Sequence, residues 1–179
     1  MAESLPRVTL VLGGARSGKS AHAEALVESR PGPCLYLATA EAGDGEMAER
    51  IAAHRARRGT RWRTLEEPLD LAGALSEGVG SDGAVLVDCL TLWLSNLLAA
   101  GRDPAEETRH LLKALPGVEV PVVFVSNEVG LGIVPMNALA RRFRDEAGRL
   151  NQAVAAAADR VVFVAAGLPL VLKPSAAHR

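Results

Sequence analysis

The sequence predicts an α/β fold with a mostly parallel sheet and helices on both faces. Short apolar runs alternate with segments of helical periodicity along the whole chain. Continuous apolar strands separated by helices are what a parallel sheet covered on both sides requires. At 179 residues the chain has the usual length of one α/β domain. We therefore expect residues 1–179 to form a single domain.

The chain is expected to open with a strand, a glycine-rich loop and a helix. Residues 8–12 are uniformly apolar and predict a buried strand. A loop over 13–20 separates this strand from a helix predicted over 21–28. The breakers Pro-Gly-Pro at 31–33 introduce a second short strand over 34–39.

The middle of the chain continues this alternation. A helix is predicted over 46–58 because its apolar positions share one face. Residues 62–66 form an extended segment, and 69–75 a second helix. The apolar run 84–88 predicts a strand that ends in a carboxylate, and the following apolar segment, 90–99, predicts another helix.

The last part of the chain is less uniform. Residues 101–115 form a polar segment with no clear pattern, whereas 121–128 repeat the theme of an apolar run that ends in polar groups. A long amphipathic helix follows over 136–158. Residues 160–165 predict the last buried strand, and 170–172 a short edge strand.

The composition limits which binding partners and which cellular compartment we expect for the protein. Apolar residues make up 49% of the chain and charged residues 23%, which is a globular composition. A net charge of −1 argues against a surface that binds nucleic acid. The start of the chain does not resemble a signal peptide, and apolar runs are too short to span a membrane. We expect a cytoplasmic protein with no integral membrane segment.

The loop after the first strand fills the pattern G-x-x-x-x-G-K-[ST] of a phosphate-binding loop, or P-loop. Its residues are Gly13, Gly14, Ala15, Arg16, Ser17, Gly18, Lys19 and Ser20. Such glycines let backbone N–H groups turn toward a polyphosphate, while Lys19 supplies charge to the β and γ phosphates and Ser20 a hydroxyl to Mg²⁺. The motif predicts a nucleoside triphosphate ligand; the alternative is an ordinary glycine-rich turn.

Polar residues end two later strands, at the edge of the sheet where ligands of such folds bind. Asp88 is a candidate ligand of Mg²⁺, or alternatively the N-cap of the helix that follows. Asn127 and Glu128 are open to three interpretations: metal-linked, substrate-binding or turn-forming.

His54 is the most unusual candidate. It shares a predicted helix face with Met47 and Ile51, and four arginines surround it, at positions 50, 55, 57 and 58. Such a cluster can bind phosphate and favours the neutral, nucleophilic imidazole. A packed histidine on a solvated, charged helix is the alternative.

Several blocks together resemble one family, the bifunctional adenosylcobinamide kinase/adenosylcobinamide-phosphate guanylyltransferases of cobalamin biosynthesis. The resemblance covers residues 8–172, and the blocks around His54 and Asn127 make it specific. The blocks are 13–20, 38–40, 50–55, 62–66, 88–91, 126–135, 141–145 and 148–152.

The resemblance implies two reactions at one nucleotide site. ATP or GTP first phosphorylates the aminopropanol hydroxyl of adenosylcobinamide. His54 then attacks the α-phosphorus of GTP, releases pyrophosphate and passes GMP to adenosylcobinamide phosphate, which yields adenosylcobinamide-GDP. The resemblance also implies a RecA-like sheet and a homotrimer.

The same resemblance implies the site residues. His54 and Lys19 would be catalytic, and Ser20 and Asp88 would bind Mg²⁺. Which carboxylate reads the guanine base is left open. Beyond the P-loop, the implied nucleotide contacts are Ala38, Thr39, Ala40, Arg55, Ala56, Arg57, Arg58, Glu66 and Asp88.

Two other functions remain open from the residues alone. One is a P-loop kinase of a different small metabolite, in which His54 is structural. The other is a nucleotide-dependent binding or switch protein with little turnover.

Overall fold

The computed structural model describes residues 5–40, 59–77, 79 and 83–175. Within these ranges the chain forms one seven-stranded sheet and five α-helices. The strands are β1 (Val8–Gly13), β2 (Cys34–Ala38), β3 (Trp62–Glu66), β4 (Ala84–Asp88), β5 (Val122–Asn127), β6 (Arg160–Ala165) and β7 (Leu168–Lys173). The helices are α1 (Lys19–Glu28), α3 (Leu71–Glu77), α4 (Leu90–Ala99), α5 (Pro104–Ala114) and α6 (Ala138–Ala157), with a 3₁₀ turn at Leu115–Gly117.

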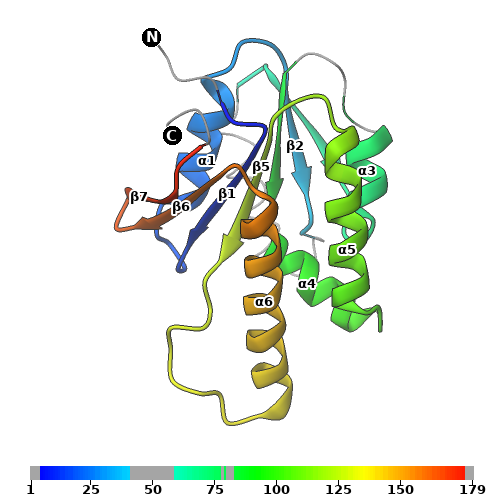
Figure 1. Cartoon of the computed structure of the whole chain (residues 1–179), viewed down its shortest axis with the longest axis vertical. Coiled ribbons are helices and arrows are strands. Elements are labelled where there is room, and N and C mark those ends of the chain that lie inside the picture. The colour runs from blue at the N-terminus through cyan, green and yellow to red at the C-terminus, as the bar shows by residue number, and fades with distance from the viewer. Residues whose placement is uncertain (1–4, 41–58, 78, 80–82, 176–179) are drawn as a thin grey trace.

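The sheet has the order β3-β2-β4-β5-β1-β6-β7 (Figure 1). All neighbouring strands are parallel except β6 and β7, which form an antiparallel hairpin. The register aligns Gly13 with Asn127, and Ala38 with both Asp88 and Glu66. The predicted site residues at the ends of the strands therefore lie along one edge of the sheet.

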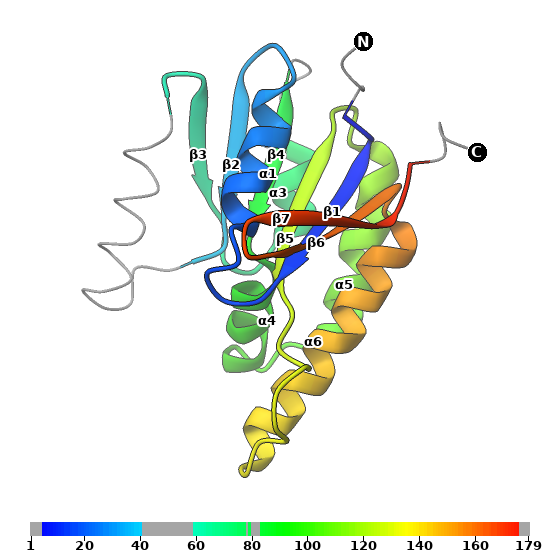
Figure 2. The ribbon, with the colours of Figure 1, turned by 90° about the vertical axis from the view of Figure 1, so that its left-hand side faces the viewer.

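Helices cover both faces of the sheet, as the sequence predicted. On one face, α1 packs on β1, β4, β5 and β6, with Ala23 and Val27 fully buried against Val11 and Val123. On the other face, α4 contacts β5 and α6 contacts β1, while α5 contacts both α3 and α6. Figure 2 shows α1 and α6 on opposite sides of the sheet. The mostly parallel sheet with helices on both faces is confirmed.

The first and last helices begin at different residues from those expected, because the residue at each N-cap sets the start. The first helix begins at Lys19 rather than 21, since Gly18 takes a left-handed conformation (φ +94°) at its N-cap. The last helix begins at Ala138 rather than 136, since the Asn137 side chain accepts a hydrogen bond from the N–H of Ala140 (2.7 Å).

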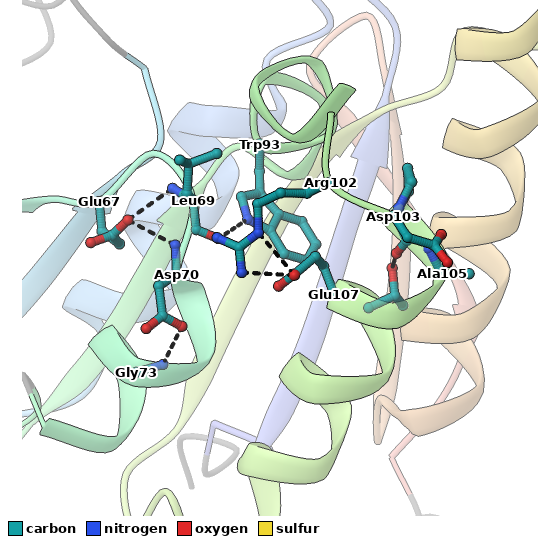
Figure 3. Close-up of polar contacts among 11 residues, drawn as sticks. Glu67, Leu69, Asp70, Gly73, Trp93, Arg102, Asp103, Ala105 and Glu107 are labelled. Carbon is teal, nitrogen blue, oxygen red and sulfur yellow. Dashed lines mark hydrogen bonds and ion pairs between the residues drawn. The ribbon is translucent and has the colours of Figure 1, made fainter. Parts of the chain in front are cut away.

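The helix expected from residue 69 begins at Leu71, because the two residues before it belong to its cap. The Glu67 carboxylate accepts hydrogen bonds from the N–H groups of Leu69 and Asp70 (2.8 Å each), and Asp70 accepts one from Gly73 (2.9 Å) (Figure 3). The indole of Trp93 on α4 donates to the carbonyl of Leu69 (2.8 Å). This cap anchors the connection after β3 to α4.

The polar segment 101–115 contains a helix, α5, which the sequence analysis missed. The Asp103 carboxylate accepts a hydrogen bond from the N–H of Ala105 (2.9 Å; Figure 3). Pro104 occupies the first turn. An Asp-Pro start is a helix signal, so the start could have been found. The segment is polar overall, and its inward face carries few large apolar side chains, of which Leu111 is fully buried, so it was interpreted as irregular.

The C-terminal strand is longer than expected. The prediction of a short edge strand over 170–172 becomes β7 with six residues, paired to β6. Four large apolar side chains on this strand are exposed: Leu168, Leu170, Val171 and Leu172.

The helix predicted over 46–58 lies outside the described residues. Over the part of the chain that is described, we find no helix with the length and apolar character needed to cross a membrane.

Candidate nucleotide-binding site

The glycine-rich loop connects the carboxyl end of β1 to the first turn of α1. The Ser17 N–H donates to the Gly14 carbonyl (3.3 Å), and the Gly18 carbonyl accepts from the His22 N–H (3.0 Å). Gly18 at the N-cap has no side chain to cap α1, and the Ser17 hydroxyl accepts a long hydrogen bond from the Lys19 N–H (3.4 Å). Such a helix start binds phosphate well, since its N–H groups and dipole both favour an anion.

Lys19 folds back over this loop. Its Nζ donates a hydrogen bond to the Gly14 carbonyl (3.0 Å), and the side chain is largely buried. The position brings a cation to the mouth of the loop, where Ala15 and Arg16 are exposed. Ser20 follows on α1 and is half-buried.

The β6–β7 turn supports the loop from one side, which sequence reasoning missed. The Gly167 N–H donates to the Ser17 carbonyl (2.8 Å), and a Cβ on Gly18 would lie 3.1 Å from the Cα of Gly167. The two segments are far apart in the sequence, so no local pattern signals this contact.

A Gly13→Ala substitution tests the tight packing at the start of the loop. The added Cβ would lie 2.5 Å from both the Ser17 Oγ and the Val164 carbonyl oxygen, and the latter is fixed backbone of β6. We expect the free energy of unfolding, measured by urea denaturation, to fall by about 1–3 kcal/mol.

Gly14→Ala is the matched control, because an added Cβ there meets nothing within 4 Å among the described residues. We expect its effect to stay within about 0.5 kcal/mol. Equal stability of the two variants would contradict the packing described here.

Asp88 stands at the carboxyl end of β4 and is half-buried. Its Oδ2 accepts a hydrogen bond from the Tyr36 hydroxyl (3.1 Å).

The alternative interpretation of Asp88 as the N-cap of α4 is wrong. Cys89 caps this helix, because its Sγ accepts a hydrogen bond from the Leu92 N–H (3.5 Å). Burial raises the pKa of the Cys89 thiol to about 11, so this group stays protonated at neutral pH.

The other predicted residues at this edge are in different environments. The Ala38 carbonyl accepts from the Glu67 N–H (2.9 Å), while Thr39 is fully buried and Ala40 half-buried. Glu66 ends β3 and is exposed. The structure thus brings Ala38, Glu66 and Asp88 onto three adjacent strand ends.

Asn127 and Glu128 lie beside the start of the P-loop. The Glu128 N–H donates to the Gly13 carbonyl (3.1 Å), and its carboxylate accepts from the Gly130 N–H. The Asn127 carbonyl accepts from the Asn151 side chain (3.2 Å). These contacts support the turn-forming interpretation for Glu128, and a role of either residue toward a ligand stays a prediction.

His54 and Arg55, Ala56, Arg57 and Arg58 lie outside the described residues. Their assignments as nucleophile and nucleotide contacts stay predictions from the sequence. Of the predicted site, the structure therefore describes the P-loop and the strand ends.

The donors at this site fit Mg²⁺. The hydroxyl of Ser20 and the carboxylate of Asp88 are hard oxygen ligands, which Mg²⁺ prefers. Among the described residues, no three His, Cys, Asp or Glu side chains gather into a metal-binding group. The ion would therefore take its other ligands from phosphate oxygens and water, as Mg²⁺ does in phosphoryl-transfer sites.

A glycine-rich loop between a buried central strand and an uncapped helix start, with a lysine over its mouth, defines a P-loop nucleotide-binding protein. Comparison of the sequence with known families assigns the protein to one family within this class. The chain belongs to the cobinamide kinase / cobinamide phosphate guanyltransferase family, whose model matches residues 9–172. It is accordingly a transferase with a kinase and a guanylyltransferase activity.

Curated relatives match almost the whole chain. The bifunctional adenosylcobalamin biosynthesis protein CobP of Pseudomonas aeruginosa is 53% identical, over 92% of this chain and 96% of its own length. The bifunctional adenosylcobalamin biosynthesis protein CobU of Salmonella typhimurium is 44% identical, over 92% of this chain and 98% of its own.

Solved structures agree on the fold. The P4 protein from bacteriophage phi6 in complex with ADP has a TM-score of 0.51 at 19% identity, over 93% of this chain and 54% of its own. A protein from Pyrococcus horikoshii OT3 has a TM-score of 0.56 at 10% identity, over 96% and 88%. These neighbours and the sheet topology confirm the α/β fold with a mostly parallel sheet, and its RecA-like character stays an expectation from the resemblance.

Proposed function

We propose that the protein phosphorylates adenosylcobinamide with ATP or GTP and then guanylylates the product, acting in cobalamin biosynthesis. The second step would proceed through a GMP bound covalently to His54 and yield adenosylcobinamide-GDP. The observation that carries the proposal is the formed P-loop, with Lys19 over its mouth, in a chain that matches the family over residues 9–172.

The first reaction needs mainly positioning and charge neutralisation. The substrate hydroxyl oxygen forms a bond to the γ-phosphorus, the bond from that phosphorus to the β–γ bridging oxygen breaks, and the nucleoside diphosphate leaves. Lys19 and the start of α1 would hold the β and γ phosphates. Bound Mg²⁺, held by Ser20 and Asp88, would neutralise the charge on these phosphates.

The second reaction needs a nucleophile as well. A neutral imidazole nitrogen of His54 attacks the α-phosphorus of GTP, and the bond to the β-phosphate oxygen breaks, which releases pyrophosphate. A phosphate oxygen of adenosylcobinamide phosphate then attacks the same phosphorus, and the P–N bond breaks. One difficult displacement is thereby divided into two, and His54 returns to its neutral form.

The nucleotide would extend from the P-loop along the strand ends. The position of Ala38, Glu66 and Asp88 on adjacent strands supports contacts of the base and ribose there. By family resemblance, Ala40 and residues 55–58 would complete the contacts, whereas the buried side chain of Thr39 would support the site from within the fold. A carboxylate facing the N1–H and amino group of guanine would select this base.

We also propose a cytoplasmic homotrimer. The segment between β5 and α6 and the start of α6 extend past the edge of the sheet (Figures 1 and 2), and exposed apolar side chains gather there. Patches of this kind are typical of protein interfaces. The side chains are Leu131, Ile133, Val134, Met136 and Leu139, each at least 59% exposed.

Intact mass spectrometry after incubation with GTP and Mg²⁺ tests the proposal. We expect the mass to rise by one GMP, peptide mapping to place it on His54, and adenosylcobinamide phosphate to discharge it. A protein that phosphorylates a small metabolite without forming the adduct would be a simple P-loop kinase. Nucleotide binding without turnover of adenosylcobinamide would instead indicate a switch protein.

A further inference from the structure

Thr39 is buried in the fold although it lies in the segment expected to bind nucleotide. Its side chain is 0% exposed. Its hydroxyl donates to the Cys89 carbonyl (2.8 Å) and accepts from the Cys89 N–H (2.9 Å). Both backbone polar groups of Cys89 are thus bound by one side chain, and the hydroxyl faces away from solvent.

The backbone of Thr39 is held in the same way. Its N–H donates to the Asp88 carbonyl (3.2 Å), and its carbonyl accepts from the side-chain amide of Asn96 on α4 (2.7 Å). Asn96 also donates to the Pro68 carbonyl (3.1 Å). The end of β2 is therefore fixed between the end of β4 and the first helix after it.

These contacts converge on Asp88. Thr39 binds the backbone on both sides of the Asp88–Cys89 peptide, and Tyr36, three residues earlier on β2, donates its hydroxyl to the Asp88 Oδ2 (3.1 Å). Strand β2 and the residue that follows it thus restrain both the carboxylate and the main chain of the proposed Mg²⁺ ligand. Groups that orient a metal ligand in this way typically change metal affinity 10- to 100-fold when removed.

We propose that Thr39 and Tyr36 are positioning residues that aim the Asp88 carboxylate at the nucleotide-bound Mg²⁺. Thr39 then acts through Asp88, and its hydroxyl makes no contact with the nucleotide. The inference rests on the proposed function, in which Asp88 is a ligand of that ion.

The test compares the affinity for a fluorescent GTP analogue in EDTA with that in saturating Mg²⁺; the ratio is the Mg²⁺ enhancement. For Thr39→Val, which keeps the shape but loses the hydroxyl, we expect an affinity in EDTA within about twofold of wild type and an enhancement reduced about tenfold. Thr39→Ser keeps the hydroxyl and is expected to restore the enhancement to within about threefold.

An Asp88→Asn background separates positioning from other effects. If Thr39 acts through Asp88, Thr39→Val adds no further loss of enhancement to Asp88→Asn, because the two residues serve one interaction. Additive losses would overturn the inference. So would an equal loss of affinity in EDTA and in Mg²⁺, which is the result expected of a direct nucleotide contact.

Tyr36→Phe keeps the test decisive if Thr39→Val does not fold, because it removes a single hydroxyl. We expect the enhancement to fall about tenfold, with the affinity in EDTA unchanged. An unchanged enhancement would overturn the inference and leave the proposed reactions standing. If Asp88→Asn alone keeps the full enhancement, the proposed Mg²⁺ ligand is wrong, and the inference falls with it.

Discussion

Replacing His54 by alanine is expected to abolish GMP transfer while phosphorylation of adenosylcobinamide at least partly survives. An imidazole that forms the covalent bond to the α-phosphorus cannot be replaced by a methyl group, so guanylyl transfer should fall at least about 10³-fold. The phosphoryl transfer uses the P-loop and needs no covalent intermediate. Separate assays of both reactions, with intact mass of the protein after GTP treatment, measure the two effects.

His110→Ala is the matched control, since His110 is an exposed histidine on α5 and has no place in the proposed site. It should leave both reactions and the adduct unchanged. Equal loss of the two activities in His54→Ala would count against a role specific to GMP transfer.

Replacing Lys19 by alanine is expected to reduce both reactions together. The ammonium group lies over the mouth of the loop, 3.0 Å from the Gly14 carbonyl, where it would meet the β and γ phosphates in either reaction. Removing one preorganised charge of this kind lowers kcat/KM by about 10²–10³-fold. Steady-state kinetics of both reactions check this, with circular dichroism to verify the fold.

Lys113→Ala removes a lysine from the last turn of α5 and serves as the control for loss of charge. Its kinetics should match wild type. If Lys19→Ala retained more than a tenth of wild-type kcat/KM in either reaction, the phosphate-binding role of Lys19 would be wrong.

The strands and the P-loop could be predicted from the sequence because their signals are local. The runs at 84–87 and 161–165 are apolar without interruption, as buried parallel strands are, and the structure places β4 (Ala84–Asp88) and β6 (Arg160–Ala165) there. The P-loop motif also predicts its flanking elements, because it occurs between a strand and a helix. By contrast, α5 was missed because the segment is polar overall, although Asp103, Pro104 and the acidic first turn are signals of a helix start.

The contacts that complete the site could not be predicted, because they join residues distant in the sequence. Nothing near Thr39 indicates that its hydroxyl will bind Cys89, fifty residues later. Likewise, the support of Ser17 by Gly167 depends on the sheet order, which brings β6 beside β1. The type of each residue suggested a ligand contact, whereas its burial depends on tertiary packing.

The central place of β1 in the sheet has a consequence for synthesis of the chain. β1 is made first, yet its neighbours are β5 and β6, and the loop that follows it is braced by Gly167. Because contacts of large sequence separation form slowly and need both partners, the phosphate-binding loop cannot reach its final structure until β6 and the β6–β7 turn have left the ribosome. Nascent chains that end before β6 can pair β1 with β5 but leave its other edge exposed, and an exposed strand edge of this kind is prone to aggregation.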